Sequence, residues 1–138
     1  MVGTVREMLV DDLPALALES DAIRLVVLPT VSGKMISLVD HSTGREWLWR
    51  SPTRRLQPPR YASNFADWDI SGFDECFPGI EEGPYPEFPW AGVEVPDHGE
   101  WWTLPWNSRV DDGEIVLSLH GVRFPYQVEK RISFVAPD

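Results

Sequence analysis

The middle of the chain, residues 51–106, has prolines and glycines that interrupt every candidate helix or strand. No strand-like or helix-like hydrophobic period is sustained there, and a long stretch of this kind in a folded domain is commonly functional or disordered. Its aromatic side chains, among them Trp68, Phe73 and Trp106, favour burial or a ligand over disorder. We therefore predict an ordered assembly of loops that contains short strands.

The two regions that flank this stretch have the pattern of β-strands. Runs rich in β-branched residues, or alternating between apolar and polar residues, predict strands over 22–28, 34–40, 46–50, 114–120 and 126–135. Turns are expected at 30–33, 41–44 and 111–113, and the one candidate for a helix is 5–10. Short strands joined by turns predict an all-β fold, an antiparallel β-sandwich formed by a single domain over residues 1–138.

The net charge of −10 is concentrated in one part of the chain. Between Tyr61 and Ser108 there are ten acidic residues and no lysine or arginine, together with five of the seven tryptophans. Nucleic-acid binding requires clustered lysine and arginine, so a nucleic-acid partner is excluded. Exposed tryptophan beside carboxylates suits a neutral sugar, because aromatic rings stack on its C–H face while acids accept its hydroxyls. A sugar phosphate would instead require an arginine clamp.

Asp97-His98-Gly99-Glu100 is the sharpest local motif. Histidine transfers protons near neutral pH, and an adjacent carboxylate can orient it. The alternative is a histidine in a turn, hydrogen-bonded to its own backbone. Cys76 lies among acids that raise the pKa of a thiol, so it is expected to be packed and unreactive.

The acidic run 67–75 has three interpretations. Asp67, Asp69, Ser71 and Gly72 have the order of the first half of a calcium-binding loop, but Pro78 stands where that loop has its glutamate. In this interpretation Asp67, Asp69 and Asp74 would bind calcium. The run is otherwise a solvated acidic loop, or a set of hydrogen-bond acceptors for a polyhydroxylated ligand. A structural domain stabilised by calcium remains one hypothesis, and we expect no bound metal or cofactor in the preferred one.

Three groups of residues, in this order, resemble the aldose 1-epimerase (galactose mutarotase-like) family. They are RLVVLP at 24–29 with GKMISLVD at 33–40 and TGREWL at 43–48, then GFDECFP at 72–78, then Asp97-His98-Gly99 followed by Trp102-Thr103-Leu104. The resemblance implies a large β-sandwich that binds a sugar across one sheet. It also implies interconversion of the α and β anomers of an aldose such as glucose or galactose, by ring opening, rotation and reclosure.

The resemblance also implies roles for individual residues. His98 matches the His-Gly position of the family and would bind or protonate the sugar, and we expect Asp74, Glu75, Asp97 and Trp101 to bind substrate. Sugar-phosphate members have an arginine shortly after this pair, where this chain has Glu100-Trp101-Trp102, so the expected sugar is not phosphorylated. Members are considerably longer, and no residue here matches their glutamate general base. The chain then resembles an N-terminal half, and a non-catalytic carbohydrate-binding module is the alternative.

The remaining expectations concern location and assembly. The single cysteine fits a reducing compartment, and MVGTVREMLVDDLPAL has acids where a signal peptide has an apolar segment. No apolar run is long enough to span a membrane, so a cytoplasmic protein without a membrane partner is expected. An unpaired apolar strand edge is a liability, and pairing of two chains through an open sheet edge would cover it.

Overall fold

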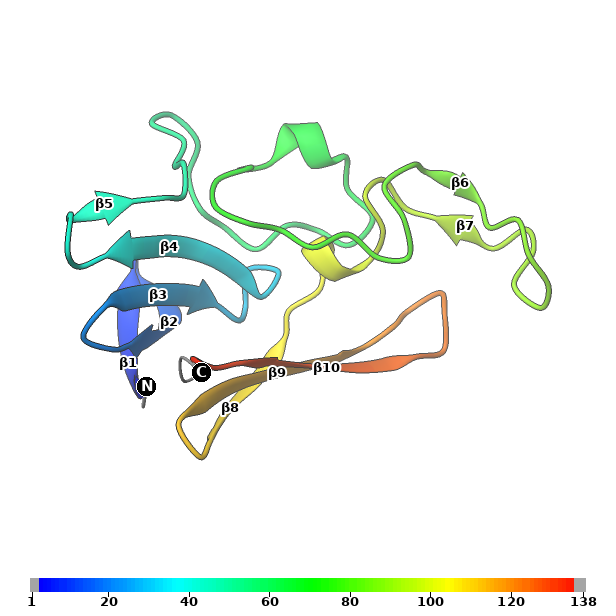
Figure 1. The fold of residues 1–138 in the computed structure, drawn as a ribbon. Coiled ribbons are helices and arrows are strands. Elements are labelled where there is room, and N and C mark those ends of the chain that lie inside the picture. The colour runs from blue at the N-terminus through cyan, green and yellow to red at the C-terminus, as the bar shows by residue number, and fades with distance from the viewer. Residues whose placement is uncertain (1–2, 136–138) are drawn as a thin grey trace.

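The structure is a computed structural model that describes residues 3–135, so residues 1, 2 and 136–138 of the expected domain lie outside it. It contains two main antiparallel sheets (Figure 1). The first has the order β1-β2-β3-β4-β5, with β1 Thr4–Val10, β2 Leu13–Glu19, β3 Ile23–Leu28, β4 Lys34–Asp40 and β5 Arg45–Glu46. The second has the order β10-β9-β8, with β8 Asn107–Asp111, β9 Glu114–His120 and β10 Gln127–Ile132.

The middle of the chain is an ordered loop assembly that contains short elements, as predicted. These are a two-stranded arm formed by β6 Gly83–Pro84 and β7 Glu94–Val95, and two 3-10 helices, η1 Phe65–Asp67 and η2 Trp101–Thr103. The loops lie over the sheets, and the arm extends away from them (Figure 1). No helix among residues 3–135 is long and apolar enough to cross a membrane.

The strongly apolar β2 and β3 are buried on both faces of the first sheet. Leu16 and Leu18 of β2 point toward β9 and pack with Ile115 and Leu117 in one core cluster. The alternate residues of the same strands pack on the opposite face in a second cluster that includes Leu56 from the loops. The first sheet is therefore a middle layer between the second sheet and the loop assembly.

One tight turn explains where the structure differs from the sequence prediction at the N-terminal end of the first sheet. Residues 5–10 were the candidate for a helix and instead belong to β1, because Asp11 and Asp12 both adopt positive φ and join β1 to β2 in a tight hairpin. The same geometry at Asp112 and Gly113 joins β8 to β9, and there the turn was predicted from the sequence. The all-β antiparallel prediction is confirmed.

The other predicted strands are found with shifted ends. Strands 22–28, 34–40, 114–120 and 126–135 correspond to β3, β4, β9 and β10, whereas 46–50 overlaps the two-residue strand β5 at Glu46 alone. β2 and β8 were not predicted. The outer strands of the second sheet are β8 and β10, and pairing of two chains through such an edge stays a prediction.

The core between the sheets gives a test of this arrangement. Leu117 is fully buried on β9, so Leu117→Ala should lower the free energy of unfolding by about 2–5 kcal/mol. Val110 on neighbouring β8 is exposed, and Val110→Ala should cost about 1 kcal/mol or less. Urea unfolding followed by circular dichroism measures both. Equal losses would contradict the packing of β9 against the first sheet.

Candidate functional site

The segment 72–78, which carries two of the predicted ligand-binding residues, is attached to the edge of the first sheet. Phe73 forms a β-bridge with Met35 of β4, and the two residues exchange backbone hydrogen bonds of 2.8 and 3.2 Å. Gly72 has a φ of +72°, and a Cβ there would lie 2.2 Å from the Met35 carbonyl oxygen. Glycine at position 72 therefore permits the close approach of segment 72–78 to β4.

A buried lysine forms an ion pair with the segment 72–78. The side chain of Lys34 on β4 is 2% exposed, and its Nζ lies 3.0 Å from Asp74 Oδ2 and 3.8 Å from Asp69 Oδ1. It also donates to the carbonyl oxygens of Asp69 and Ser71, both at 2.9 Å. Burial raises the pKa of Asp74, and the charge of Lys34 opposes this rise. Lys34 thus compensates two acids of the run 67–75.

The Asp97-His98-Gly99-Glu100 motif, which we call the His98 turn, lies against the other end of this segment. Phe77 forms a parallel bridge with Gly99, and the Glu100 N–H donates to the Phe77 carbonyl at 2.7 Å. Both His98 and Gly99 have positive φ, and a Cβ on Gly99 would lie 2.1 Å from the Phe77 oxygen. The structure therefore brings together the two motifs that the sequence analysis singled out separately.

The His98 ring is oriented by contacts on two sides. Its Nδ1 lies 2.7 Å from Asp97 Oδ1, while Asp97 Oδ2 accepts the Phe65 N–H at 2.6 Å. The Phe65 ring stacks on the imidazole, with centroids 4.1 Å apart and planes inclined by 12°. The Phe65 N–H, and then His98, lower the pKa of Asp97. Because an ionised carboxylate only accepts hydrogen bonds, Nδ1 carries a hydrogen and Nε2 is left to exchange a proton.

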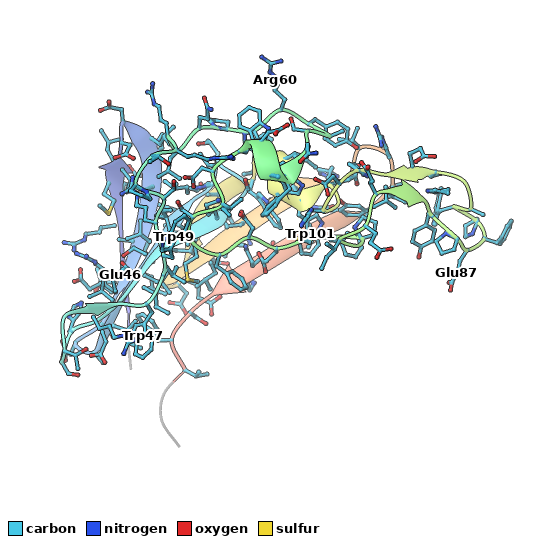
Figure 2. The ribbon with its side chains drawn as sticks, turned by 90° about the horizontal axis from the view of Figure 1, so that it is seen from above. Glu46, Trp47, Trp49, Arg60, Glu87 and Trp101 are labelled. Atoms are coloured by element: carbon cyan, nitrogen blue, oxygen red, sulfur yellow. The ribbon has the colours of Figure 1, made fainter. Side chains whose placement is uncertain are left out.

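The other predicted ligand-binding residues have different surroundings. Glu75 forms an ion pair with Lys130 of β10, and Lys130 also lies over the Trp106 ring. The Trp101 ring stacks on Phe77 with centroids 4.8 Å apart, and its Nε1 is buried without a hydrogen-bond partner among the described residues. Trp101 lies near the middle of the molecule, whereas Trp47 and Trp49 lie toward the β5 end and Glu87 on the arm (Figure 2).

Acids from both motifs surround the thiol of Cys76. Burial raises the pKa of Cys76, and the charges of Asp74, Asp97 and Glu75 raise it further. A thiol held in its protonated form is a poor nucleophile, as expected from the neighbouring acids.

The structure does not gather a calcium site from the acidic run. Asp69 and Asp74 approach the Lys34 ammonium group, and Asp67 lies in η1. Among residues 3–135 there is no group of three or more side chains placed to hold a metal ion.

Three residues that help to form the site were not predicted from the sequence: Lys34, Phe65 and Lys130. Glu100 belongs to the motif that the sequence analysis singled out, but its contacts were not predicted. It is fully buried and accepts the hydroxyl hydrogens of Tyr61 at 2.6 Å and Tyr126 at 2.9 Å. The only local signal for Lys34 was its place at the start of a predicted strand. Phe65 and Lys130 reach the site through contacts between distant parts of the chain, for which the sequence holds no local pattern.

Comparison with solved structures identifies the fold. A protein described as a "putative mutarotase (YeaD)" from Salmonella typhimurium matches with a TM-score of 0.62 at 17% identity, over 94% of this chain and 43% of that chain. The protein HI1317 matches with a TM-score of 0.52 at 15% identity, over 96% of this chain and 48% of that chain. This chain therefore spans less than half the length of either protein.

Sequence comparison adds nothing to this likeness. No known family's sequence model matches the chain, and no curated protein matches it. At such low identities the structural matches establish the fold alone. The chain has a mutarotase-like, antiparallel β-sandwich fold.

The contact between Gly99 and Phe77 can be tested with a matched glycine. Gly99→Ala should cost more than Gly92→Ala, because both positions have positive φ but only Gly99 faces a backbone atom. The strain of positive φ alone costs on the order of 1 kcal/mol, which is the loss expected at Gly92. Urea unfolding measures both variants. Equal losses would show that the His98 turn does not lie against the 72–78 segment as described.

The tyrosines that donate to Glu100 predict a loss of stability in alkali. Burial, followed by the contact with Glu100, raises the pKa of both Tyr61 and Tyr126. The unfolded chain therefore releases tyrosine protons above about pH 10 while the folded chain keeps them, so the free energy of unfolding should fall as pH rises past that value. Tyr61→Phe/Tyr126→Phe should reduce this dependence, measured by urea unfolding between about pH 8 and 11. Tyr85→Phe is the control, and an equal effect of that variant would contradict the assignment.

Proposed function

We propose that this chain carries part of the carbohydrate site of an aldose 1-epimerase-like protein, in which His98 exchanges a proton with a neutral aldose. The observation that supports this most directly is the Asp97–His98 contact of 2.7 Å, because it determines which imidazole nitrogen is available. The mutarotase-like fold is consistent with the proposal, as is the resemblance of the His98 turn to the His-Gly motif of that family.

In the proposed reaction His98 acts on the ring oxygen of the sugar. Protonated His98 donates the Nε2 proton to that oxygen while a base removes the proton of the anomeric hydroxyl, so that the ring C–O bond breaks and an aldehyde forms. Rotation about the first carbon–carbon bond and reversal of these steps gives the other anomer and restores both groups. Asp97 holds the imidazole and stabilises its cationic form. We assign the base to no residue of this chain.

The charges around the 72–78 segment favour a neutral sugar over a phosphorylated one. Lys34 and Lys130, the two lysines that approach this segment, are engaged by Asp74 and Glu75. A phosphate group requires a cation that is free to bind it, and additional carboxylates beside the site repel it. Asp74, Glu75, Asp97 and Trp101 remain the proposed substrate-binding residues.

Anomer exchange measured by NMR tests the role of His98. His98→Asn should lower the exchange rate for glucose or galactose by about 100-fold or more, which is the usual contribution of a general acid–base group. Asparagine is the appropriate replacement because it tolerates the φ of +57° at this position. His120→Asn, an exposed change at the end of β9, is the control and should leave the rate unchanged.

Titration of the same sugars, followed by tryptophan fluorescence, separates catalysis from binding. Binding without exchange by the unmodified chain would support a non-catalytic carbohydrate-binding module. Absence of binding to any neutral aldose would contradict the carbohydrate proposal as a whole. An exchange rate that is the same in His98→Asn and in the unmodified chain would remove His98 from the mechanism.

A further inference from the structure

Glu100 is a buried carboxylate that receives hydrogen bonds from two separate segments. Its Oε1 accepts the Tyr61 hydroxyl at 2.6 Å, the Arg123 N–H at 2.8 Å and the Val122 N–H at 3.1 Å. Its Oε2 accepts the Tyr126 hydroxyl at 2.9 Å. The donors come from the loop after β5 and from the β9–β10 connection, which are distant from Glu100 in the sequence.

These hydrogen bonds compensate an unusual burial of charge. Glu100 is 0% exposed, and within residues 3–135 no lysine, arginine or histidine side chain forms an ion pair with it. An isolated buried carboxylate is costly unless hydrogen bonds replace its hydration. Four donors aimed at its two oxygens do so, and bonds to an ionised acceptor are stronger than those between neutral groups. The Glu100 carboxylate therefore fixes the positions of these four donors relative to the Glu100 backbone.

That backbone is part of the His98 turn. Glu100 follows Gly99 directly, and its N–H is bonded to Phe77 on the segment that carries Asp74 and Glu75. One residue thus attaches the turn to the 72–78 segment through its backbone and to Tyr61 and Tyr126 through its side chain. Tyr126 is also one wall of an aromatic cavity of about 230 Å³, which Phe77 and Trp90 line with it.

We propose that Glu100 is the positioning residue of the His98 turn. By gathering the four donors it holds the turn in the one place where the His98 ring meets both Asp97 and Phe65. It touches no substrate and acts through His98. This inference rests on the proposed function where it concerns activity. The position of the His98 ring, however, can be observed without any sugar.

The position of the His98 ring can be read from NMR. Because Phe65 stacks on the imidazole, its ring current shifts the ring-proton signals of His98, and loss of the stack would move them toward those of a solvent-exposed histidine. Labelling histidine with carbon-13 at Cε1 isolates three ring signals, one for each histidine, and the spectrum of His98→Asn identifies the one that belongs to His98.

Two substitutions of similar size separate the acceptor role from the filling of space. In Glu100→Gln the amide oxygen still accepts three donors, and the amide NH₂ donates to the Tyr126 oxygen, so the His98 signal should stay in place. In Glu100→Met no acceptor remains, so the His98 signal should move while those of His41 and His120 stay. An unchanged His98 signal in folded Glu100→Met overturns the proposal.

Controls exclude a general effect of lost stability. Leu117→Ala lowers stability at the core without removing any donor to Glu100, and should leave the His98 signal in place. A movement in Leu117→Ala equal to that in Glu100→Met would overturn the proposal. If Glu100→Met does not fold, Tyr61→Phe/Tyr126→Phe removes two of the four donors and should move the signal part of the way. An unchanged signal in that double variant would then overturn it.

Sugar titration of the same variants keeps the two proposals apart. If the unmodified chain binds neutral aldoses, Glu100→Gln should retain the affinity and Glu100→Met should lose it in parallel with the movement of the His98 signal. If the unmodified chain binds no aldose, the proposed function fails, while the NMR result still decides the role of Glu100.

Discussion

The ion pair between Lys34 and Asp74 is the constraint on which the arrangement of the site depends. A lysine at the start of β4 is 2% exposed, and its ammonium group is compensated only because the loop after residue 68 folds over it. Leaving such a charge buried without its partner is strongly unfavourable, so the loop and the sheet are held together. The bridge between Met35 and Phe73 continues this attachment along the backbone.

The contacts that position His98 depend on this attachment of the loop to β4. The 72–78 segment meets the edge of β4 at Phe73, and the carbonyl of its Phe77 accepts the Glu100 N–H of the His98 turn. Glu100 attaches the same turn to the β9–β10 connection, so both sheets contribute to its position. The site is therefore built from irregular backbone, and the regular strands serve as the support to which it is attached.

Much of the fold was predictable from the sequence, since strand patterns depend on neighbouring residues. The β-branched run at β3, the alternating patterns at β4, β9 and β10, and the Asp112-Gly113 turn are local signals of this kind. β1 was mistaken for a possible helix because the Asp11-Asp12 turn is a weaker signal than one that contains glycine. β2 lacks clear alternation because it is buried on both faces, which removes the polar side that marks a strand.

The all-β class, the two motifs of the site and the excess of acids between residues 61 and 108 follow from the order of the amino acids. What those acids do depends on how the chain folds. Lys34 and Lys130, which lie outside the acidic stretch, neutralise Asp74 and Glu75, while Glu100 is compensated by hydrogen bonds alone. The reason is that electrostatic compensation acts through space, so the partner of a charge is determined by the folded chain and not by its neighbours in sequence.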